Sequence, residues 1–210
     1  MEEKEIHDEL AAIRGLMERS SKFISLSGLS GILAGVYALI GSAAAYELFY
    51  TGERRDTYNP KYHSFGYFMD SNIGTALLIA IAVLVLSLVT GLILSSRQAK
   101  RKGQALWGKT SQALLFHMAT PLITGGVLIL IFISRGYYGI VGPSSLIFYG
   151  LSLVSASNFT FTMVKYLGLC EIALGLIAAC VPGYGLLFWA VGFGVLHIVY
   201  GGMMYLKYDR

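Results

Sequence analysis

The sequence predicts an all-α, polytopic membrane protein: a bundle of about six transmembrane helices with both termini in the cytoplasm. Of its 210 residues, 55% are hydrophobic and 13% are charged, whereas about 25% are charged in a typical soluble domain. The stretch from Ile73 to Ser96 contains no ionisable side chain, and about 20 apolar residues suffice to cross a bilayer core. Together, these observations exclude a soluble protein.

Apolar segments divide the chain into three parts. Residues 1–22 are predicted to form a short amphipathic cytoplasmic helix, because apolar residues recur there at helical spacing. Residues 23–206 are predicted to form the transmembrane domain, and residues 207–210 a cytoplasmic tail. The six expected spans are residues 23–48, 73–94, 112–134, 143–163, 166–181 and 185–206.

Prolines and polar segments set the limits of these spans. Pro121 is expected to kink the third span, whereas Pro143 suits the first turn of the fourth. Pro182 and Gly183 predict a tight reversal before the last span. Lys165 alone separates the fourth span from the fifth, and without that boundary the chain would have five spans.

The distribution of basic residues predicts the orientation. With the N-terminus inside, twelve lysines and arginines fall in cytoplasmic segments and four fall outside, which is the bias typical of membrane proteins. This bias also explains the net charge of +4 without nucleic-acid binding. We expect a multi-pass protein of a plasma (inner) membrane, in a bacterium, whose main partner is the lipid bilayer.

Small residues at helical spacing mark the predicted contacts between helices. In lipid, apolar helices associate through close backbone approach, which small residues permit. The first span contains a GxxxG pair, and the fifth and sixth spans carry similar stripes. The glycines assigned to helix packing are Gly31, Gly35, Gly168, Gly175, Gly194 and Gly201.

Four polar residues on such stripes form the candidate site. Glu171 lies on a small-residue stripe of the fifth span, His197 on one of the sixth and His117 on one of the third, while Asn158 lies in the fourth. A carboxylate within a membrane is costly, so it must be protonated, paired or hydrated, and such groups are functional candidates. The sequence therefore predicts a site for a small solute or protons, with transport as the expected role and a cavity open toward the cytoplasm.

Two other classes of function remain open at this point. His117 and His197 are a possible pair of axial haem ligands, and together with Glu171 they are a possible divalent-metal set. Either would make the protein a cofactor-binding protein and a candidate oxidoreductase. Alternatively, residues 2–20 dock a cytoplasmic protein partner, and the chain acts as a membrane-embedded interaction or sensor protein. A homo-oligomer is compatible with each reading.

Overall fold

The computed structural model describes residues 27–48, 72–101 and 107–209, and every regular element in these ranges is a helix. The predicted amphipathic helix and most of the polar segment after the first span lie outside the described residues. Six described helical segments are long and apolar enough to cross a membrane, which confirms the all-helical class and the six apolar segments. These segments are Gly28–Tyr46, Ile73–Arg101, Lys109–Ser134, Tyr138–Phe159, Thr162–Cys180 and Gly185–Lys207.

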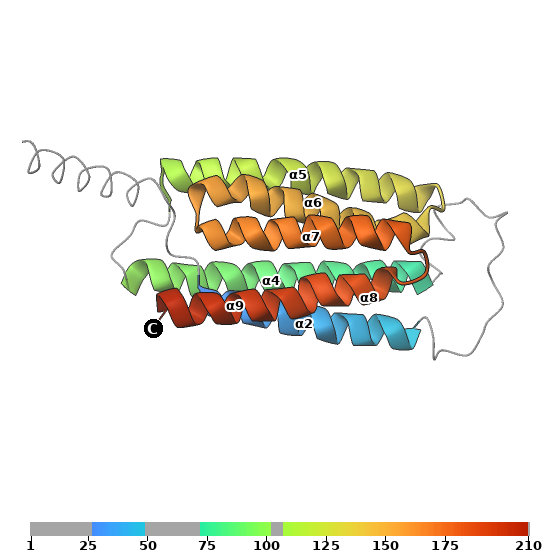
Figure 1. Cartoon of the computed structure of the whole chain (residues 1–210), viewed down its shortest axis with the longest axis horizontal. Coiled ribbons are helices and arrows are strands. Elements are labelled where there is room, and N and C mark those ends of the chain that lie inside the picture. Colours follow the sequence, from blue (N-terminus) through green and yellow to red (C-terminus); the bar gives the residue numbers. More distant parts are fainter. Residues whose placement is uncertain (1–26, 49–71, 102–106, 210) are drawn as a thin grey trace, which may run out of the picture.

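The six segments comprise several helical elements (Figure 1). The first three are α2, α4 and α5. The fourth joins the short η2 to α6 and ends in η3, the fifth is α7, and the last runs through α8, η4, α9 and η5. Their bounds are α2 Gly28–Tyr46, α4 Asn72–Arg101, α5 Lys109–Ser134, η2 Tyr138–Ile140, α6 Val141–Ala156, η3 Ser157–Phe159, α7 Thr162–Cys180, α8 Gly185–Trp189, η4 Ala190–Leu196, α9 His197–Met204 and η5 Tyr205–Asp209.

The breaks between helices follow local chemistry. Gly136 and Gly183 have positive φ angles of 79° and 93°, which glycine adopts readily, and each lies in a turn between two long helices. Pro121 lies within α5, and Pro143 lies in the first turn of α6. The chain leaves the helical conformation at Thr160, so Lys165 belongs to the first turns of α7 and does not mark the boundary.

The helices form two groups (Figure 1). In the first, which we call the α6 group, α6 packs between α5 and α7. In the second, the α2 group, α2 packs against α4 on one side and against η4 and α9 on the other. The groups meet along a seam, where α6 and α7 contact α8 and α7 contacts η4 and α9.

Glycines allow the closest helix contacts within each group. A Cβ atom on Gly35 of α2 would lie 2.6 Å from the carbonyl oxygen of Gly194, and one on Gly201 would lie 2.7 Å from that of Gly28. Between α6 and α7, a Cβ on Gly168 would lie 2.7 Å from the carbonyl oxygen of Gly150. Gly31 faces the Gly201 backbone, and Gly175 faces that of Pro143. All six glycines assigned to packing therefore lie at helix–helix contacts.

We expect Gly168→Ala to destabilise the protein by about 1–3 kcal/mol, because overpacking forces helices apart. The added methyl group would meet backbone, which cannot rotate away as a flexible side chain can. Gly126→Ala in α5 is the matched control, because nothing lies within 4 Å of its Cβ position. Thermal unfolding in detergent micelles should separate the two variants; equal melting temperatures would contradict this account of the α6–α7 contact.

Candidate functional site

The last membrane-length segment contains a π-helical stretch, η4, which ends immediately before His197. Short π-helical stretches are rare and are often found at functional sites. The imidazole of His197 turns back along its own helix, so that its Nδ1 lies 3.0 Å from the carbonyl oxygen of Gly192. Because a carbonyl oxygen only accepts, this hydrogen bond places a proton on Nδ1.

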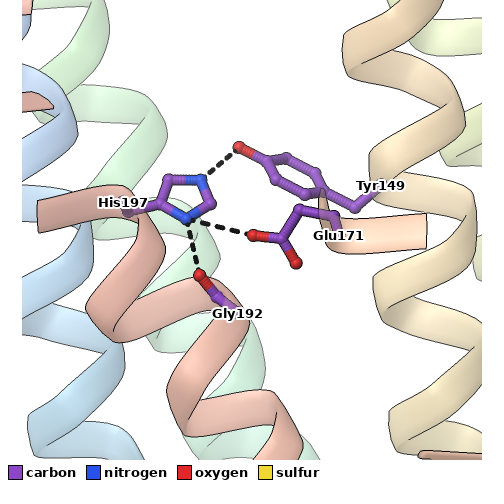
Figure 2. A network of polar contacts seen from close by, with 4 residues as sticks. All are labelled: Tyr149, Glu171, Gly192 and His197. Atoms are coloured by element: carbon purple, nitrogen blue, oxygen red, sulfur yellow. Dashed lines mark hydrogen bonds and ion pairs between the residues drawn. The ribbon is translucent and has the colours of Figure 1, made fainter. Parts of the chain in front are cut away.

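Tyr149 of α6 occupies the other side of the imidazole (Figure 2). Its hydroxyl oxygen lies 2.7 Å from His197 Nε2. In a neutral imidazole protonated at Nδ1, Nε2 accepts, so the hydroxyl donates to it; in an imidazolium, Nε2 donates and the hydroxyl accepts. Tyr149 therefore remains hydrogen-bonded in both states of His197.

Glu171 lies at the midpoint of α7 and is fully buried. Its Oε1 atom lies 3.4 Å from His197 Nδ1, a contact that Figure 2 shows reaching across to the helix of His197. Neither carboxyl oxygen has a hydrogen-bond partner among the described residues. A buried polar group without a hydrogen bond is costly, so this carboxyl group is the least satisfied buried feature of the site.

Gly192 makes room for the carboxyl group. A Cβ atom at this position would lie 2.5 Å from Glu171 Oε2 and 2.5 Å from a methyl carbon of Leu146. Gly192 thus serves the site twice: its carbonyl oxygen holds the imidazole, and its missing side chain admits the carboxyl group. The site is built from α6, α7, η4 and α9, and therefore lies in the seam between the two helix groups.

This arrangement can bind and release a proton. In the low dielectric of a helical interior, a lone carboxylate is strongly disfavoured. The pair can exist as carboxylic acid and neutral imidazole, or as carboxylate and imidazolium. Because Nδ1 already carries a proton, the imidazolium forms when Nε2, which faces the Tyr149 hydroxyl, gains a proton while Glu171 releases its own. The lysines and arginines in the described ranges lie at or near helix ends, so His197 is the cationic partner that the geometry provides.

The structure brings together two of the four candidate residues, Glu171 and His197. His117 is exposed on α5, where its ring lies 4.9 Å from that of Phe159. Asn158 is also exposed, and its side-chain amide donates to the carbonyl oxygen of Ser155 over 3.3 Å. The expectation that these two side chains face the site is therefore wrong.

The polar stripe of α5 faces outward because its hydroxyls need no neighbouring helix. Thr120 donates to the carbonyl oxygen of Phe116, and Thr124 donates to that of Thr120. The contact face of α5 instead includes Gly125, which packs against Phe148, and the carbonyl oxygen of Met118, which accepts a hydrogen bond from Ser152.

The predicted cofactor ligands are not assembled either. Among the described residues, no group of three histidine, cysteine or acidic side chains has the geometry to hold a metal ion. A haem between His117 and His197 would need both imidazoles to face one cavity. One is exposed, and both ring nitrogens of the other already contact protein atoms.

Sequence reasoning missed Tyr149 and Gly192. Tyr149 lies in the middle of an apolar span, where its hydroxyl requires a partner, and this is a signal that the sequence contains. Gly192 gave no signal, because in a regular α-helix it would lie well off the stripe of Gly194, His197 and Gly201; only the π-helical stretch turns its carbonyl oxygen toward His197.

Comparisons with protein-family models, curated proteins and solved structures found no match to this chain. Its function is therefore inferred from the geometry of the buried residues. Glu171 provides an ionisable carboxyl group and Tyr149 a hydroxyl, and both contact the imidazole of His197 in the middle of predominantly apolar helices.

Proposed function

We propose that this chain is a multi-pass membrane protein that moves protons, alone or coupled to a small solute, through the seam between its two helix groups. Glu171 is the proton-binding group, His197 is the ionisable partner whose positive charge balances the carboxylate, and Tyr149 holds the imidazole in both of its charge states. One observation carries the proposal: a fully buried carboxyl group without a hydrogen-bond partner lies 3.4 Å from an imidazole.

The position of the site supports transport over a purely structural role. Polar contacts that only fix helix packing satisfy their own hydrogen bonds, as Ser152 does with the carbonyl oxygen of Met118. The carboxyl group of Glu171 does not. It also bridges two helix groups that pack less extensively against each other than within themselves, and a change in its charge alters the attraction across the seam.

The distribution of charge supports an orientation with both termini in the cytoplasm. Among the described residues, basic side chains lie where α4 ends, where α5 and α7 begin and near the C-terminus, whereas Arg135 follows the other end of α5. In Figure 1 these helix ends lie on the left, and the C-terminal end of α5, which Arg135 follows, lies on the right. A bacterial plasma membrane and a partner for residues 2–20 remain predictions from the sequence.

Reconstituted liposomes test the proposal. With a pH-sensitive dye inside and an imposed proton gradient, we expect wild-type protein to carry protons and Glu171→Gln to reduce flux to that of empty vesicles. The amide cannot bind and release a proton but keeps the size of the carboxyl group. Glu47→Gln, at the end of α2, is the matched control and should retain full flux.

Two results would contradict the proposal. One is wild-type flux in Glu171→Gln, since the carboxyl group would then have no part in the pathway. The other is an absence of proton flux from wild-type protein across the tested gradients and potentials, with folding verified by circular dichroism.

A further inference from the structure

A cavity of about 370 Å³ opens in the seam between the two helix groups. It lies where α2 ends and α4 begins, at the end of the molecule opposite the basic helix ends. The α2 group contributes Ala45, Leu77 and Trp189 to its wall, and the other side includes Ile133, Tyr138 and Gly142.

The cavity suits a compact, apolar molecule that can pack against the aromatic side chains of its wall. Its volume falls within the range of small-molecule sites, and none of its lining residues is charged. Two of its walls are aromatic, at Trp189 and Tyr138. Aromatic ring faces attract organic cations, with tryptophan the most effective.

Aromatic rings continue from the cavity to the candidate site. The ring of Trp189 lies 5.0 Å from that of Phe193, which in turn lies 5.0 Å from Tyr149 and 6.0 Å from His197. On α6, Gly142 lines the cavity, and Leu146, one turn further, packs beside Glu171 at Gly192. One helical turn, about 5.4 Å, therefore separates the cavity wall from the level of the carboxyl group.

We propose that this cavity binds a small lipophilic organic cation in exchange for the proton of Glu171; the inference rests on the proton-handling role proposed above. The carboxylic acid loses its proton to water, and the resulting carboxylate neutralises the cation bound one turn away. The total charge inside the protein is unchanged. In a medium of low dielectric, the attraction between the carboxylate and the cation extends over one helical turn. The aromatic rings bind the cation without adding charge.

The titratable groups near Glu171 agree with this exchange. His197 contacts the carboxyl group, Tyr149 contacts His197, and Tyr200 lies on α9 one turn beyond His197. The lysines and arginines of the described ranges lie at or near helix ends and not in the middle of α7. A neutral imidazole beside a carboxylate leaves one negative charge for the cation to balance.

The test compares two probes of the same shape, benzyltrimethylammonium and its neutral isostere neopentylbenzene. Trp107→Phe leaves Trp189 as the sole tryptophan, so its fluorescence reports the cavity of full-length protein in nanodiscs, with empty nanodiscs as the blank. We expect a saturable response to the cation and about one proton released for each cation bound. Neopentylbenzene should release no protons.

Variants distinguish the contribution of the cavity to binding from that of the carboxyl group. Glu171→Gln should weaken binding of benzyltrimethylammonium at least tenfold, abolish proton release and leave the response to neopentylbenzene unchanged. Ala76→Phe should fill the cavity and abolish both responses, because Ala76 lines it. Ala82→Phe, at an exposed position of the same helix, is the matched control and should bind as the parent does.

Two outcomes overturn the inference. Equal binding of both probes without proton release would make this a cavity for neutral molecules. No response to either probe would mean that lipid or the chain itself fills it. If liposome flux still depends on Glu171 in those cases, the proposed proton function stands without a cation site; if the cation binds with proton release but no flux occurs, the transport role alone fails.

Discussion

Replacing His197 with leucine is expected to lower proton flux about 100-fold or more, the scale on which positioned acid–base groups contribute. Leucine removes Nδ1, 3.4 Å from Glu171, and Nε2, 2.7 Å from the Tyr149 hydroxyl. The carboxyl group loses its ionisable partner and the hydroxyl its hydrogen bond. Each buried group left without a partner should also cost about 1–3 kcal/mol of stability.

His117→Leu is the matched control for this prediction. It makes the same chemical change at an exposed position of α5, so flux should stay at the wild-type level. Flux through both variants should be measured in the same liposome assay, with unfolding in detergent alongside. Equal losses of flux in the two variants would show that His117 also takes part in proton transfer. Wild-type flux in His197→Leu would show that the His197 imidazole does not.

Gly192→Ala is expected to reduce flux nearly as much, although it removes no ionisable group. The new methyl carbon would lie 2.5 Å from Glu171 Oε2, closer than unbonded atoms approach, so the carboxyl group must shift from its position beside His197. We expect at least a tenfold loss of flux but a smaller loss of stability than in Gly168→Ala, because the crowded atoms are the ends of the Glu171 and Leu146 side chains and not backbone.

Gly202→Ala makes the same change in the same long helix and should be neutral, because nothing lies within 4 Å of its Cβ position. Comparing the two separates the effect on the carboxyl group from a general intolerance of alanine in this segment. If Gly192→Ala retained wild-type flux, the placement of Glu171 against Gly192 would not matter for function.

Much of the architecture is predictable from the sequence because lipid imposes strict rules. The apolar segments and the prolines predict the six helices, and the small-residue stripes of the first, fifth and sixth spans predict which faces of α2, α7 and α9 contact other helices. The boundary at Lys165 was placed incorrectly, because a lysine near a helix end resembles a turn when helix lengths are unknown. The chain breaks at Thr160, where no proline or glycine marks the turn.

The site was predictable only in part. Glu171 and His197 lie on stripes of small residues, and those stripes do face neighbouring helices. The same reasoning failed for His117, because the threonines of its stripe bond to carbonyl oxygens of their own helix and can face outward. The role of Gly192 depends on the π-helical geometry of η4, which alters the helical period and so the direction of the Gly192 carbonyl group. No residue pattern in the sequence predicts this change.

Infrared spectroscopy of the reconstituted protein during a pH titration tests the central claim most directly. The account predicts a carbonyl stretch from a protonated carboxylic acid that Glu171→Gln removes, that Glu47→Gln leaves in place, and that disappears over the pH range in which proton flux changes. A spectrum in which Glu171→Gln removes no such band, or in which the band stays constant while flux changes, would contradict the assignment of Glu171 as the proton-binding group.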